Sequence, residues 1–235
     1  MLVVEHLTVD IQGSRILRGI SLRVEAGEVV CLVGRNGAGK TTALRTILGY
    51  RRPAGGRVLF KGRDLVGLPT HAIAALGVGF SPEESEVFGD LTVAENLALP
   101  TWTRPTARSA AERLERAYRL FPRLRAYADR GGTQLSGGER KMLSVARALA
   151  LDPDLLLLDE PFEGLAPAVV PVIAGSIAEI ARLGLGVLLA ESNVHHVPEE
   201  TARLYVLERG EIIFAGQPQE ARRDPAVLRI IGGAA

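Results

Sequence analysis

The stretch Gly34–Thr42, "GRNGAGKTT", constrains the fold more than any other part of the chain. It fits the pattern G-x-x-x-x-G-K-[ST], follows the apolar run 29–33 and precedes a helical pattern over Ala43–Leu48. Its three glycines allow backbone angles that a Cβ would forbid, so successive N–H groups can point inward. Together with the positive end of the following helix, these donors predict a cradle for a polyphosphate.

Side chains of the same loop complete the expected site for a nucleoside triphosphate. Lys40 is expected to place its ammonium against the β- and γ-phosphates, and Thr41 to offer its hydroxyl to Mg²⁺. Thr42 is expected beside the α-phosphate. The nucleotide-binding residues predicted here are Gly34, Arg35, Asn36, Gly37, Ala38, Gly39, Lys40, Thr41 and Thr42.

Composition narrows the class of protein. A length of 235 residues with 47% hydrophobic residues predicts one large α/β domain, or a domain with a subdomain. The formal net charge of +1 gives no reason to expect a nucleic-acid partner. One cysteine, Cys31, excludes an internal disulfide framework and is expected to be buried. Since neither a signal peptide nor a membrane-spanning run is evident, we expect a cytoplasmic protein that meets membranes only through partners.

Periodicity predicts the order of the parts. Residues 1–30 have the pattern of short antiparallel strands, and the helical pattern from Val93 to Ala128 suggests a helical subdomain inserted into an α/β core. The predicted fold is α/β, with residues 1–83 and 151–235 forming the nucleotide-binding core of a P-loop NTPase (RecA-like). Residues 84–150 form the helical subdomain, and the tail from Pro218 is expected to be a short closing helix.

A second chemical motif is "DLLLLDEP". Four leucines, Leu155–Leu158, predict a strand buried on both faces, which ends in Asp159 and Glu160. The carboxyl end of a parallel strand meets a ligand crevice, so Asp159 is placed to hold the Mg²⁺ shell. Glu160 is placed to orient and deprotonate the water that attacks the γ-phosphate, as a general base. Alone, such acidic residues are as often turn formers.

The third motif, "LSGGE", opens a helix. Ser136 is a good N-cap, and Gly137 and Gly138 are expected to leave the helix N-terminus uncovered by side chains. One chain already has a phosphate cradle, so this helix end is expected to face a nucleotide bound by a second copy of the protein. The alternative is an ordinary capped helix.

Together these motifs resemble those of ATP-binding-cassette (ABC) ATPases, the nucleotide-binding subunits of membrane transporters. The three motifs stand in that family's order and spacing, and the resemblance covers almost the whole chain. It implies a head-to-tail dimer that binds two ATP molecules, each between Lys40 of one copy and Ser136, Gly137 and Gly138 of the other. It also implies integral-membrane permease subunits and a place on the cytoplasmic face of the membrane.

Further stretches resemble the small ATPase subunit of bacterial branched-chain amino acid importers: "VFGDLTVAENL", "YRLFPRL", "RGGTQLSGGERKML", "DEPFEGLAP" and "YVLERGEI". In that group Pro-Glu replaces a common glutamine, here Pro82-Glu83, which implies that Glu83 touches the Mg²⁺ and water network and adjoins the membrane subunit. The alternative for Glu83 is a solvated acidic loop. This resemblance implies a periplasmic or extracellular substrate-binding protein as a further partner.

The chain departs from the family pattern at two positions of the site. The aromatic residue that usually stacks on adenine is Ile11 here, which is expected to bind adenine by apolar contact, without the aromatic contribution of about 1 kcal/mol. The histidine that contacts the γ-phosphate in many relatives is Ser192, which is shorter and carries no charge. His195 and His196 are expected in the next helical turn, with surface or packing roles.

The sequence is also compatible with other functions. An exporter ATPase, for example one that extracts lipid or lipopolysaccharide, is the main competitor, and a urea or other solute importer is also possible. A non-transport ABC ATPase acting on DNA or ribosomes usually carries coiled-coil, zinc or tandem modules that this sequence lacks. A phosphate-loop kinase would leave "LSGGE" unexplained. For transport, Val87 and Phe88 are expected to supply apolar contacts in a groove that docks the permease.

Overall fold

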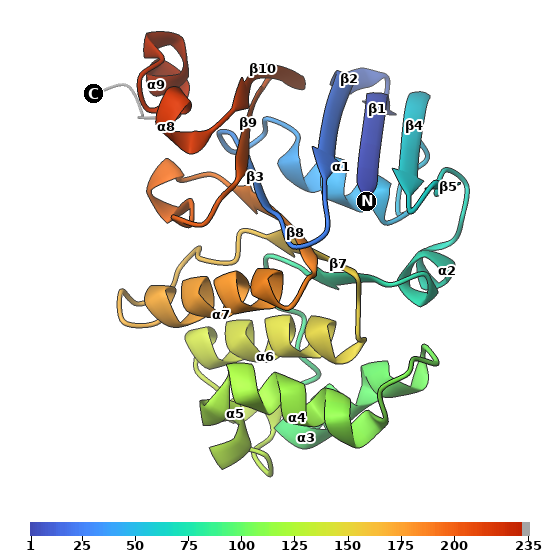
Figure 1. The fold of residues 1–235 in the computed structure, drawn as a ribbon, viewed down its shortest axis with the longest axis vertical. Coiled ribbons are helices and arrows are strands. Elements are labelled where there is room, and N and C mark those ends of the chain that lie inside the picture. The colour runs from blue at the N-terminus through green and yellow to red at the C-terminus, as the bar shows by residue number, and fades with distance from the viewer. Residues whose placement is uncertain (232–235) are drawn as a thin grey trace.

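Two sheets organise the fold of residues 1–231, which the computed structural model describes (Figure 1). One sheet has the strand order β2-β1-β4-β5, and the other has the order β10-β9-β3-β8-β7-β6. The strands are β1 Leu2–Ile11, β2 Ser14–Val24, β3 Val29–Val33, β4 Gly55–Phe60, β5 Arg63–Asp64, β6 Val78–Ser81, β7 Leu155–Asp159, β8 Gly186–Glu191, β9 Arg203–Glu208 and β10 Glu211–Gly216. The first sheet is antiparallel, as the pattern of residues 1–30 predicted.

Helices fill the sequence between the strands. They are α1 Lys40–Ile47, α2 Thr70–Ala75, α3 Val93–Ala98, α4 Ala110–Leu120, α5 Pro122–Ala126, α6 Gly137–Ala150, α7 Val170–Arg182, α8 Pro218–Ala221 and α9 Pro225–Ile231, with 3-10 turns η1 Leu99–Trp102, η2 Gly132–Gln134 and η3 Val194–His196. Among the described residues, no helix is long and apolar enough to cross a membrane.

The larger sheet sets the position of the site. Strands β6, β7, β8, β3 and β9 are parallel neighbours, and every residue of β3 and β7 is buried. The register pairs Val33 with Glu191 and Asp159 with Ala190. The carboxyl ends of β3, β8 and β7 therefore meet at one edge, where the phosphate loop and the acidic pair both emerge.

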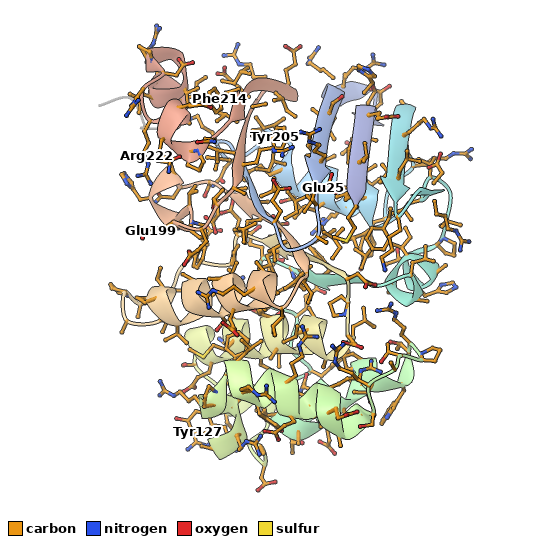
Figure 2. All side chains as sticks on the ribbon, viewed as in Figure 1. Glu25, Tyr127, Glu199, Tyr205, Phe214 and Arg222 are labelled. Carbon is orange, nitrogen blue, oxygen red and sulfur yellow. The ribbon has the colours of Figure 1, made fainter. Side chains whose placement is uncertain are left out.

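Helix α1 joins the two sheets. Its apolar residues Ala43, Leu44 and Ile47 belong to a core shared with both sheets. Tyr205 of β9 lies in the same core, and its hydroxyl accepts a hydrogen bond of 3.2 Å from the backbone N–H of Arg23 in β2 (Figure 2). The antiparallel sheet is thus fixed beside the phosphate loop.

Helices α3 to α6 gather at the end of the molecule remote from β1, β2 and β4 (Figure 1). A second core, which includes Leu97, Phe121 and Leu143, connects them to the larger sheet. The mixed α/β fold, with its antiparallel sheet and helical subdomain, confirms the predicted fold class.

The predicted helical pattern from Val93 to Ala128 consists of three α-helices and a 3-10 turn, because Pro100 and Pro105 cannot continue a helix and interrupt the segment between α3 and α4. One local prediction was wrong in detail. The tail from Pro218 contains two short helices instead of one, since Asp224 precedes Pro225 and starts a new helix.

Candidate functional site

The phosphate loop has the tight backbone that its glycines predicted. Gly39 precedes α1 with φ 113°, and a Cβ there would lie 2.7 Å from Leu17 Cδ2. A Cβ on Gly34 would lie 2.3 Å from the carbonyl oxygen of Leu207. These two positions therefore accept only glycine without a shift of the neighbouring chain.

A cavity of about 380 Å³ lies beside this loop. Its walls come from the β1–β2 hairpin, the loop with the start of α1, and two acidic positions distant in sequence: Ile11, Ile16, Asn36, Gly37, Gly39, Lys40, Thr41, Thr42, Glu83 and Glu160. Gly34, Arg35 and Ala38 belong to the same loop without lining the cavity. Sequence reasoning missed Ile16, although its place across the hairpin turn from Ile11 would have indicated it. The two isoleucines form an apolar wall.

Lys40 and Glu160 form a buried ion pair in the wall of the cavity. Lys40 Nζ lies 3.1 Å from Glu160 Oε1, and both side chains are 5% exposed. The ammonium also donates to the carbonyl oxygen of Gly34 at 2.7 Å. Glu160 has a left-handed φ of 44°, a strained conformation of the kind that functional sites retain. Its carboxylate is thus held against the cation that the loop supplies.

Ser192 holds the other oxygen of the same carboxylate. Its backbone N–H and its hydroxyl both donate to Glu160 Oε2, at 2.9 and 3.1 Å. Ser192 does not line the cavity. The position that carries a histidine in many relatives therefore orients Glu160 in this chain, which sequence reasoning did not predict.

Oxygen ligands suited to Mg²⁺ stand next to the ion pair. Thr41 Oγ1 donates to Asp159 Oδ1 at 3.2 Å. Asp159 is buried, which raises its pKa, although the Thr41 hydroxyl opposes this shift. The pKa of Glu83 is also raised, first by burial and then by the charges of Glu163, Glu84 and Asp159. Neighbouring carboxylates beside a hydroxyl are a donor set that fits a hard divalent cation.

Glu191 is a further buried acid that sequence reasoning missed. It ends β8, is fully buried, and its Oε1 accepts a hydrogen bond from the backbone N–H of Phe162 at 3.3 Å. Burial and the adjacent charge of Glu160 raise the pKa of Glu191 to about 9. His196 Nδ1 lies 3.4 Å from Oε2, and the His196 ring packs on Phe162. Glu191 is therefore a neutral acid near pH 7.

The "LSGGE" segment begins α6 as predicted. Ser136 caps the helix, and its side chain accepts from the N–H of Glu139 at 3.3 Å. The Glu139 carboxylate accepts a hydrogen bond from the N–H of Ser136 at 2.9 Å and pairs with Arg123. The expectation of an uncovered N-terminus was therefore wrong in part, because Glu139 completes a capping box there. A Cβ on Gly137 would meet nothing, and none of Ser136, Gly137 and Gly138 lines the cavity.

A separate apolar groove of about 490 Å³ runs between α2, β6 and the η1 segment. Phe88 and Trp102 line it and are 52% and 76% exposed. The expectation for Val87 was wrong, because Val87 is not part of this lining and packs against the core that connects the helices to the larger sheet.

Comparisons with known proteins agree with this geometry. The ABC transporter family profile matches residues 17–163. The chain is 40% identical over 220 residues to the lipopolysaccharide export system ATP-binding protein LptB of Acidithiobacillus ferridurans, covering 93% of this chain and 90% of the relative. It is 41% identical over 199 residues to the high-affinity branched-chain amino acid transport ATP-binding protein BraG of Pseudomonas aeruginosa, covering 84% of each chain.

Among solved structures, the ADP conformation of MJ1267, an ATP-binding cassette of an ABC transporter, superposes with a TM-score of 0.88 at 26% identity. The superposed residues cover 100% of this chain and 99% of the MJ1267 chain. The motifs, the cavity and these likenesses lead to one assignment. The chain belongs to the ABC transporter family and is one of its ATP-binding cassette ATPases.

Proposed function

We propose that this chain is the Mg²⁺-dependent ATP-hydrolysing subunit of an importer for branched-chain amino acids. The observation that carries the catalytic part is the buried pair of Lys40 and Glu160, at the point where the phosphate loop meets the carboxyl end of β7. A cation for phosphate and a carboxylate for water stand side by side there. Ile11 and Ile16 supply an apolar wall against which the adenine ring can lie.

Binding of ATP would exchange the partner of Lys40. The γ-phosphate takes the ammonium from Glu160, and the freed carboxylate becomes available to accept a proton from the attacking water. Ser192 keeps that carboxylate oriented through its two hydrogen bonds. Thr41 and Asp159, with Glu83 nearby, would hold Mg²⁺, which stabilises the charge on the phosphates.

The remaining surfaces suit an assembly. Ser136, Gly137 and Gly138 lie outside the cavity of their own chain, and we assign them to the ATP of a second ATPase subunit in a head-to-tail dimer. The groove with Phe88 and Trp102 is suited to an apolar segment of a permease. The chain would then sit on the cytoplasmic face of the membrane, with a substrate-binding protein on the opposite side.

Different observations support each of the two candidate transported substrates. The stretches "VFGDLTVAENL" and "DEPFEGLAP" and the likeness to BraG favour branched-chain amino acids. The likeness to LptB, which extends over 93% of this chain, favours lipopolysaccharide export as the second candidate. The residues of the ATP site do not distinguish them, because cargo is bound by the membrane subunits.

The test is complementation in the source cells after deletion of the gene. We expect the native chain to restore uptake of radiolabelled leucine, and Glu160→Gln to assemble without restoring it. An Arg119→Gln variant on the exposed face of α4 serves as the control. Restored lipopolysaccharide at the cell surface, with leucine uptake unchanged by the deletion, would establish the exporter instead.

A further inference from the structure

One face of α6 holds the loop that follows β6. Lys141, Ser144 and Arg147 are spaced three residues apart, so they lie along the same side of the helix. Each of them bonds to a different part of the segment 81–88. That segment contains Glu83, which lines the nucleotide cavity, and Phe88, which lines the apolar groove.

Lys141 holds the end nearer the cavity. Its ammonium donates to the carbonyl oxygen of Glu83 at 2.6 Å and to that of Pro82 at 3.4 Å, and the residue is 3% exposed. Within residues 1–231 it forms no ion pair. Burial lowers its pKa, opposed by the charges of Glu191 and Glu83. A buried ammonium bound only to carbonyl oxygens is costly, so it needs a reason beyond packing.

Ser144 and Arg147 hold the rest of the segment. The hydroxyls of Ser144 and Ser81 are 2.8 Å apart and buried. Arg147 donates to the carbonyl oxygen of Glu86 at 2.7 Å, and its guanidinium stands over the Phe88 ring, 5.1 Å from the centroid.

The held segment is strained. Ser85 and Glu86 have φ values of 66° and 44°, which place two successive residues with side chains in the left-handed region. Such a conformation persists only where the surroundings determine it. The bond from Arg147 to Glu86 falls at this point.

We infer that Lys141, Ser144 and Arg147 form a clamp that makes α6 and the segment 81–88 one mechanical unit. Lys141 is its positioning residue for hydrolysis, because it fixes the backbone of Glu83 beside the cavity. Arg147 fixes the groove end of the same segment. A movement of the Ser136 end of α6 is thereby passed to both places. The inference rests on the proposed function, in which Glu83 acts at the ATP site.

A double-mutant cycle on the purified full chain tests the clamp. Lys141→Met is combined with Glu83→Gln, and kcat and KM for ATP are measured for all four proteins, with Lys61→Met as an exposed control of the same substitution. We expect Lys141→Met alone to lower kcat by about 10- to 100-fold, with KM changed by less than about twofold. On the Glu83→Gln background the further loss should be below about twofold.

Melting curves accompany each variant, and if Lys141→Met does not fold, Lys141→Gln replaces it in the cycle. Lys141→Arg keeps a buried donor and should recover most of the lost kcat. Equal fold losses on both backgrounds, or native kcat in the Lys141 variant, would overturn the clamp. Native kcat in Glu83→Gln alone would instead contradict the role proposed for Glu83, and the clamp with it.

Discussion

The phosphate loop, residues 34–42, and the segment 81–88 both border the nucleotide cavity, yet they are held in different ways. The first takes its shape from its own glycines, whose missing Cβ atoms let residues 34 and 39 pass close to Leu207 and Leu17. The second contains two left-handed residues that are not glycine, and it depends on bonds from α6, which lies about sixty positions further along the chain.

This difference suggests separate roles for the two segments in binding ATP and in coupling the ATP site to partner subunits. A loop whose shape is set by its own glycines is pre-organised for its ligand. A segment held by another helix moves when that helix moves. We therefore assign capture of ATP to the phosphate loop, and communication with partners to the segment 81–88.

The largest effect is expected for hydrolysis. Glu160→Gln keeps the shape of the side chain but removes the general base, so kcat should fall by about 10²- to 10⁴-fold while ATP still binds. Phosphate release and nucleotide binding are measured on the same samples, with Glu211→Gln, an exposed residue at the start of β10, as the control. Native turnover would remove Glu160 from the catalytic role.

Nucleotide affinity should respond next. Lys40→Ala removes the charged donor of the phosphate loop, which costs about 2–3 kcal/mol, or about 30- to 150-fold in the dissociation constant for ATP. Isothermal titration with ATP measures this, and Lys61→Ala is the matched control on the surface. Unchanged affinity would show that the phosphate loop is not the cradle.

Acidity of Glu191 should affect stability. The folded pKa of about 9 exceeds the ordinary value of 4.5, so the folded chain holds a proton that the unfolded chain releases, and stability falls as pH rises through that window. One such proton contributes at most about 1.4 kcal/mol per pH unit. Urea unfolding between pH 5 and 8 should show a shallower decline for Glu191→Gln. If the free energy of unfolding declined with the same slope in the native chain and in Glu191→Gln, Glu191 would not be protonated in the folded chain.

The smallest effect on the isolated chain is expected at Phe88. Because this side chain is half-exposed, Phe88→Ala should change the free energy of unfolding by less than about 1 kcal/mol and leave hydrolysis near native. Assembly with the permease and leucine uptake should nevertheless fall, since the groove loses its aromatic wall. Ile213→Ala, on the edge strand β10, is the control. Intact assembly and uptake would exclude Phe88 from the docking surface.

Sequence reasoning succeeded where structure is local. The strand before Gly34, the buried leucines of β7 and the Ser136 cap each follow from a few adjacent residues. It could not find Glu191, because a glutamate after a run of apolar residues gives no sign that neighbouring strands will bury it. Lys141 was missed for a similar reason, since its partners lie 58 and 59 positions away.

The central claim, that residues 34–42 and Glu160 form one ATP site, is tested most directly by a crystal structure of Glu160→Gln with ATP and Mg²⁺. The account predicts the triphosphate within the loop and Lys40 Nζ moved from residue 160 to the phosphates. Thr41 and Asp159 should face the metal, and Ser136 of a second copy should approach the γ-phosphate. A nucleotide bound without contact to residues 34–42 would contradict it.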